Sequence, residues 1–104
     1  MARMDQHDTA GRHASLLQEL SEERAVALLR LTRKLEWLID RLHDARKQMP
    51  SDGSTAHTVA IAAYHELRNQ ALQYRWYVEV QREAIGLHRH DVLDEFYRIP
   101  PSLE

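Results

Sequence analysis

The chain has 104 residues, of which 43% are hydrophobic and 29% are charged, and its formal net charge at pH 7 is −2. This length predicts one domain with a small core, and this composition excludes a disordered chain. The sequence contains no cysteine, which excludes disulfides, thiol catalysis and cysteine-ligated metal sites.

The amino-terminal residues are polar and lack the apolar stretch of a signal peptide. No apolar run approaches the roughly 20 residues that a membrane-spanning helix needs. We therefore expect a soluble, cytoplasmic protein that does not contact membranes. Residues 1–13 are expected to form a flexible polar leader, and residues 14–104 a single helical domain.

The first predicted helix covers about residues 15–49. Its apolar positions recur at alternating spacings of three and four, which is the heptad pattern of a helix that packs against another helix. These positions are Leu28, Leu31, Leu35, Leu38, Leu42, Ala45 and Met49. Pro50 disfavours helical geometry in the residue before it, so we expect the helix to end there.

Residues 50–55 form a predicted turn, in which Ser54 or Thr55 can cap the next helix. The second predicted helix covers about residues 56–88 and repeats the heptad spacing. Its heptad positions are Ala60, Tyr64, Leu67, Ala71, Tyr74, Val78, Gln81 and Ile85. A short turn between two such helices predicts an antiparallel hairpin.

The second helix carries a further apolar stripe that lies off this heptad seam. It consists of Leu72, Trp76, Val80 and Leu87. One partner helix cannot cover both apolar faces, so we expect either the carboxy-terminal segment or another chain to cover the stripe.

Four arginines recur every seven residues beside the seam of the second helix: Arg68, Arg75, Arg82 and Arg89. Charges at such flanking positions pair with acids of a neighbouring helix and select partners. We therefore expect this arginine row to form ion pairs with the first helix and to contribute to a partner-binding surface.

The carboxy-terminal segment contains a short predicted helix over about residues 92–97, with Asp91 as its expected N-cap. Pro100 and Pro101 end regular structure after it. The expected fold is thus all-α: an antiparallel, coiled-coil-like hairpin of two long helices with a short carboxy-terminal helix.

A two-helix hairpin buries one stripe of each helix and leaves much apolar surface in water. Trp37 is expected on the outer side of the first helix, off the seam. Dimerisation into a four-helix bundle is the simplest way to cover such surface. A complex with a different protein, or a monomer closed by its own carboxy-terminal segment, are the alternatives.

Two groups of side chains have the spacing of metal ligands. His88, His90 and Asp91 fall within four residues, and Asp40 and His43 are three apart beside Glu36. The second group lies outside the seam, whereas bundle metal sites lie inside it. For the first group a helix-end role, with histidine at the carboxy terminus and Asp91 as a cap, is the better interpretation. We therefore predict no metal site and no cofactor.

The sequence contains no glycine-rich phosphate loop and no nucleophile motif, so we expect no enzymatic activity. The prediction is a non-enzymatic protein–protein interaction module: an adaptor, a regulator or a small accessory subunit of a bacterial-type complex. It would act as a homodimer and bind a partner protein through the stripe and arginine row of the second helix together with Trp37 of the first. A nucleic-acid-associated bundle using the arginine row, and a metal- or ligand-binding bundle, are alternative functions.

Overall fold

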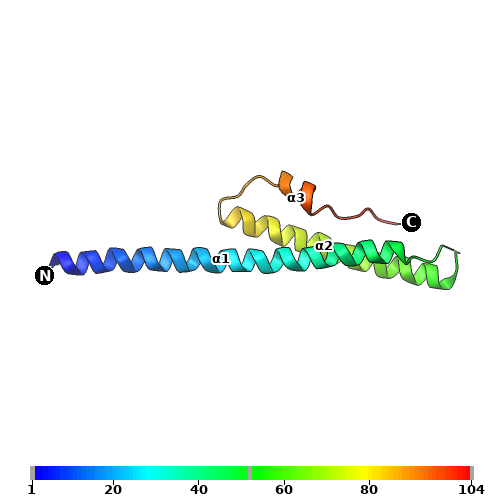
Figure 1. Ribbon diagram of the computed structural model, residues 1–104, viewed down its shortest axis with the longest axis horizontal. Helices are drawn as coiled ribbons and strands as arrows, with labels where there is room; N and C mark the ends of the chain where they lie inside the picture. The colour runs from blue at the N-terminus through cyan, green and yellow to red at the C-terminus, as the bar shows by residue number, and fades with distance from the viewer. Residues whose placement is uncertain (1, 52, 104) are drawn as a thin grey trace.

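The computed structural model describes residues 2–51 and 53–103, with side chains from residue 10 onward, and the described chain is all-helical. Two long helices, α1 (Ala2–Lys47) and α2 (Thr55–Ala84), pack against each other, and a short helix, α3 (Asp91–Phe96), follows. Figure 1 shows α2 running back along the carboxy-terminal half of α1. The predicted all-α hairpin with a short third helix is therefore confirmed.

The heptad positions of both helices form the core between α1 and α2. Leu35, Leu38 and Leu42 of α1 are completely buried, and Tyr64, Ala71 and Val78 of α2 lie against them. Other seam residues pack around these side chains and are partly buried: Leu28, Leu31, Ala45, Met49, Leu67 and Tyr74. Ile85, at the end of the predicted seam, is exposed. Among the described residues no polar or charged side chain is buried. Burial of apolar surface thus holds the hairpin together.

The turn between the long helices follows the sequence signals closely. α1 ends at Lys47, before Pro50, and the next residues include Gly53, whose φ of +68° is favourable only for glycine. Ser54 is the N-cap of α2, and its side-chain oxygen accepts a hydrogen bond from the backbone N–H of His57 at 3.3 Å. Ser54 was one of the two predicted caps.

α2 ends at Ala84, four residues before the expected end at residue 88. Gly86 adopts a φ of +90°, and its N–H donates to the carbonyl of Glu83 at 3.0 Å. The N–H of Leu87 donates to the carbonyl of Arg82 at 2.8 Å. These two bonds form the Schellman motif that closes helices at a glycine, so Gly86 ends α2.

α1 begins much earlier than expected. The helix extends back to Ala2, so the residues expected as a polar leader lie within α1, except Met1, which lies outside the described residues. Gly11 is the one strong helix breaker in this part of the sequence, and a glycine costs a helix only about 1 kcal/mol relative to alanine. The added Cβ of a larger residue at Gly11 would meet no other atom, so this glycine has no packing role.

The unequal lengths of the two helices leave part of α1 without a neighbour. α1 has 46 residues and α2 has 30, and α2 ends beside the middle of α1. The first half of α1, here called the arm (residues 2–27), extends beyond the hairpin (Figure 1). The molecule is therefore 81 Å long but only 22 Å by 15 Å across.

The segment after α2 folds back over one side of the hairpin. Leu93 of α3 is buried in a cluster with Leu35, Ile39 and Val78, and Val92, Tyr97 and Ile99 pack against it. The N-cap of α3 is His90, so the prediction of Asp91 as the cap was wrong by one residue. Asp91 instead lies in the first turn, where an acidic side chain also favours the helix dipole.

None of the described helices combines the length and the apolar character needed to cross a membrane.

Leucines of α1 are expected to differ sharply in their contribution to the free energy of unfolding, because some are buried in the core and others are exposed. Replacement of buried Leu38 by alanine is expected to lower the free energy of unfolding by about 2–5 kcal/mol, because it leaves a cavity between α1 and α2. The matched control, Leu29→Ala, changes a side chain outside the arm that is 48% exposed and should cost about 1 kcal/mol or less. Urea denaturation of both variants measures this difference. Equal losses would contradict the assigned core.

Candidate functional site

The apolar stripe predicted on α2 is exposed. Leu72, Trp76 and Val80 lie one turn apart on the outer surface of α2, and Trp76 is 59% exposed. The folded-back segment does not cover them, because it packs on the side of Leu35, Ile39 and Val78. Leu87 is also exposed but lies beyond the end of α2, so it does not continue the helical stripe.

The arginine row has partners that differ from those predicted. Arg68 donates from Nε to the carbonyl of Pro100 at 2.8 Å, and Arg75 forms an ion pair with Asp94 of α3. Arg82 donates to the carbonyl of Arg89 at 2.8 Å. The prediction of ion pairs with acids of the first helix was therefore wrong. Successive arginines instead hold the carboxy-terminal segment against α2.

Arg89, the last arginine of the row, lies after the end of α2. It is almost fully exposed, and its guanidinium is 3.6 Å from the carboxylate of Asp91. This position separates Arg89 from the helical surface that carries the other three. The row is thus no continuous basic stripe: three of its members are occupied by the segment from residue 89 onward.

The proline-rich end of the chain is anchored by polar side chains of α2. The hydroxyl of Tyr64 donates to the carbonyl of Pro101 at 2.7 Å, beside the Arg68 bond to Pro100. Farther along, the N–H of Leu103 donates to Nε2 of His65 at 3.3 Å. A proline has no N–H to donate but keeps a carbonyl that needs a donor, and here side chains of α2 supply it.

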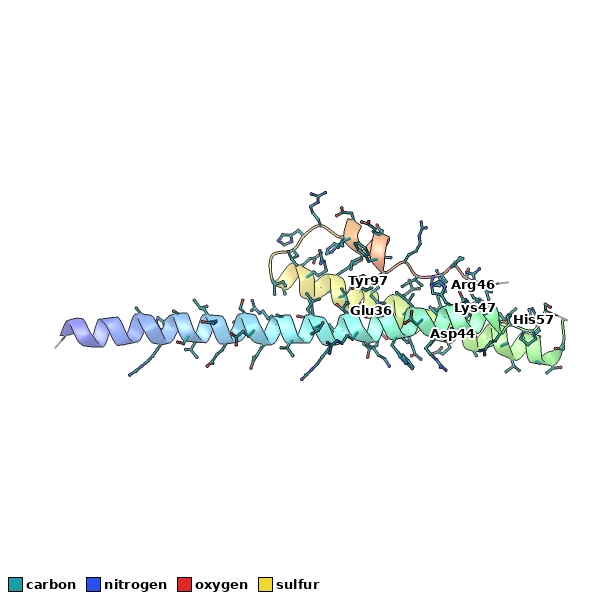
Figure 2. All side chains as sticks on the ribbon, in the orientation of Figure 1. Glu36, Asp44, Arg46, Lys47, His57 and Tyr97 are labelled. Carbon is teal, nitrogen blue, oxygen red and sulfur yellow. The ribbon has the colours of Figure 1, made fainter. Side chains whose placement is uncertain are left out.

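One hydrogen bond ties the carboxy-terminal segment to α1. The hydroxyl of Tyr97 donates to the carboxylate of Glu36 at 3.1 Å, and Figure 2 shows the two side chains facing each other. Burial raises the pKa of the Tyr97 phenol, and the hydrogen bond and negative charge of Glu36 raise it further. Both causes favour the protonated phenol that this bond requires.

The candidate metal ligands do not come together. His90 contacts Glu83 of α2 at 2.9 Å, while Asp91 lies beside Arg89 and His88 is exposed. Within residues 2–51 and 53–103 there is no group of three side chains of the ligand types that could hold a metal ion. Near the start of α3, His90 and Asp91 thus have Glu83 and Arg89 as their neighbours, and the cap is His90 and not Asp91 as the helix-end interpretation expected.

Trp37 lies on the outer surface of α1, as predicted, and is 51% exposed. The ammonium of Lys34 lies 4.3 Å from the centre of its ring, and the guanidinium of Arg41 lies 5.6 Å from it. Such contacts hold cations over an aromatic face. Lys34 also lies 6.0 Å from the ring of Tyr74 in α2. The helical spacing of three and four around Trp37 could have predicted both cation contacts.

The aromatic rings continue from α1 onto α2. Tyr74 packs edge-on against Tyr77 at 5.5 Å, and Tyr77 contacts Trp76 at 5.6 Å. The two exposed tryptophans are therefore joined by a row of rings and Lys34 across the hairpin. Adjacent aromatic side chains of this kind are enriched in the central part of protein interfaces.

The arm of α1 is a further surface that the sequence interpretation missed. Large apolar side chains on it are exposed: Leu16, Leu17, Leu20 and Val26. They were assigned to no partner surface because the helix was expected to start near residue 15 and to pack along its length.

Comparisons of the chain with protein-family models, with curated proteins and with solved structures find no match.

The anchoring role of the arginines is testable with the hydrogen exchange of backbone amides. Arg68→Ala removes the bond to Pro100 and is expected to cost about 1 kcal/mol. Amides of Leu93, Tyr97 and Ile99 should exchange faster, because the segment opens locally before the hairpin does. Arg98→Ala, which changes an exposed arginine of the same segment, should leave exchange unchanged. Equal exchange in both variants would contradict the anchor.

Proposed function

We propose that this protein is a non-enzymatic protein–protein interaction module that acts as a homodimer in the cytoplasm. The observation that carries this proposal is the arm of α1, a long helical segment with exposed leucines and no neighbouring element in the part of the chain that the structure describes. Isolated helices are marginal in water, and most helical stability in proteins comes from packing of an apolar face. A second chain would supply that packing.

Homodimerisation would bring four long helices together, two from each hairpin. A two-fold dimer is the commonest closed assembly, and it adds buried apolar surface that a chain of 104 residues has little of. The side of the hairpin covered by α3 is already occupied by Leu93 and its neighbours. Any dimer contact would therefore use the arm and the surface around Trp37.

The second part of the proposal is a partner protein that docks on Leu72, Trp76 and Val80. Side chains spaced by four form a ridge that fits the groove of another helix, so we propose a helix of the partner as the occupant. Exposed tryptophan is a frequent centre of binding energy in such contacts. The position of the stripe, away from both α3 and the arm, supports an adaptor that dimerises through one surface and binds through another.

The alternative nucleic-acid function has weaker support. Phosphate binding needs unoccupied cations, and Arg68, Arg75 and Arg82 are engaged with the carboxy-terminal segment. The net charge of −2 also opposes association with a polyanion.

Affinity purification with matched variants tests the partner surface. Trp76→Ala should weaken binding of the captured partner at least tenfold, because it removes a large exposed side chain from the centre of the stripe. Val59→Ala, a control at another exposed apolar position of α2, should retain full binding. Quantitative mass spectrometry followed by titration of the recovered partner gives the two affinities. Equal binding by both variants would remove the proposed surface.

A further inference from the structure

α1 carries a second heptad pattern that is separate from the buried seam. Its spacings alternate between four and three, like those of the seam, but its residues lie about 160° around the helix from it. We call these residues the outer strip: Arg12, Leu16, Glu19, Glu23, Val26, Arg30, Arg33, Trp37 and Asp40. All nine side chains are exposed.

Among the residues whose side chains are described, the charges of the outer strip form no ion pairs. Ion pairs between described residues involve Arg75, Arg89 and His90 as the cations, and none of them involves a residue of the strip. A shallow depression lies along the middle of the strip and is lined in part by Glu19, Glu23 and Val26. The strip thus offers charges and apolar groups to a neighbour that the chain itself does not provide.

Two antiparallel copies of the outer strip are complementary to each other: acidic residues of one copy face basic residues of the other, and apolar residues face apolar residues. When two copies of α1 lie antiparallel with Val26 at the two-fold axis, positions whose numbers add to 52 or 53 face each other. Glu23 then faces Arg30 and Glu19 faces Arg33 of the second copy. Toward the ends of the strip, Leu16 faces Trp37. The outermost pair is Arg12 with Asp40, again of opposite charge.

We propose that the outer strip is the homodimer interface, and that two copies of α1 pair antiparallel about Val26. Each arm then lies along the carboxy-terminal half of the other copy's α1, beside Trp37. The lengths agree, because residues 5–25 of one α1 face residues 27–47 of the other over roughly 32 Å at 1.5 Å per residue. A parallel pairing in register would instead place Glu19 against Glu19 and Arg33 against Arg33, so the same charges oppose it.

The surroundings of the strip allow this contact. α3 and the segment after it lie on the side of α1 that carries Glu36 and Ile39. At the end of the strip, Asp40 borders a depression that Phe96 and Tyr97 also line. The long stems of arginine and glutamate can pack beside Val26 while their charged groups stay in water. Cation contacts already hold the Trp37 ring in place for an arriving leucine. This inference rests on the proposed homodimer and specifies its geometry.

Charge exchange between two variants tests the pairing. The acidic-to-basic variant Glu19→Lys/Glu23→Lys and the basic-to-acidic variant Arg30→Glu/Arg33→Glu should each raise the dimer Kd about 100-fold, because four attractive contacts become repulsive. A 1:1 mixture of the two should recover the affinity of the wild-type protein as a heterodimer. Sedimentation velocity of the full chain measures all three values. The control Glu66→Lys/Glu95→Lys, at exposed positions off the strip, should leave Kd unchanged.

Engineered cysteines give the register independently of folding effects, since the natural chain has none. Val26→Cys at the two-fold axis should oxidise to a covalent dimer. Leu16→Cys should not, because antiparallel pairing separates the two copies of residue 16 by about 30 Å along the axis. Cross-linking at residue 16 but not at residue 26 would overturn the antiparallel register.

Two results of the sedimentation experiment distinguish the strip from the homodimer. A dimer whose Kd is insensitive to all charge variants would overturn the strip while retaining the homodimer. A wild-type chain that stays monomeric at high concentration would overturn both.

Discussion

The difference in length between α1 and α2 is the constraint on which the rest of the structure depends. Only the carboxy-terminal half of α1 has α2 beside it, because Gly86 closes α2 after 30 residues. The buried core is consequently confined to the overlap, around Leu35, Leu38 and Leu42. The arm extends α1 without contributing to that core. The molecule therefore has one self-sufficient part and one part whose apolar side chains face water.

Within the overlap, the carboxy-terminal segment substitutes for a third long helix on one side. Leu93 enters the core, and the arginines of α2 fix the extended residues that follow. These arginines are therefore bound to the carboxy-terminal segment and are not available to another molecule. The segment leaves Trp37 and Trp76 exposed elsewhere on the hairpin, with half-buried Tyr74 and Tyr77 between them. The covered side of the hairpin therefore stabilises the fold, while the proposed binding residues lie elsewhere.

The sequence predicted the elements whose signals are local. Heptad spacing located the seam residues of both helices, and proline and glycine located the turn. The end of α2 was placed late because heptad spacing continues through Ile85, whereas the Schellman bonds at Gly86 decide the boundary. The start of α1 was also misplaced: polar residues suggested a leader, but polar helix formers interrupted by a single glycine, Gly11, remain helical.

The partners of the arginine row could not be predicted, for a different reason. A position beside the seam indicates that an arginine will bind an acceptor group. It does not indicate which one, because both the neighbouring helix and the returning segment could supply acceptors. Asp94 and the carbonyls of Pro100 and Arg89 became the partners because Leu93 is buried beside Val78, which brings that segment to the arginines. The exposure of Leu72 and Trp76 follows from the same event, since the segment packs on the other side of α2.

The central claim is that the arm of α1 is packed by a second copy of the chain. Hydrogen exchange of backbone amides at several protein concentrations tests it most directly, because dimer contacts dissolve on dilution and intrachain contacts do not. The account predicts that amides of residues 12–26 are protected at high concentration and lose protection on dilution, while those of residues 31–42 stay protected throughout. Arm amides that exchange rapidly at every concentration would contradict it.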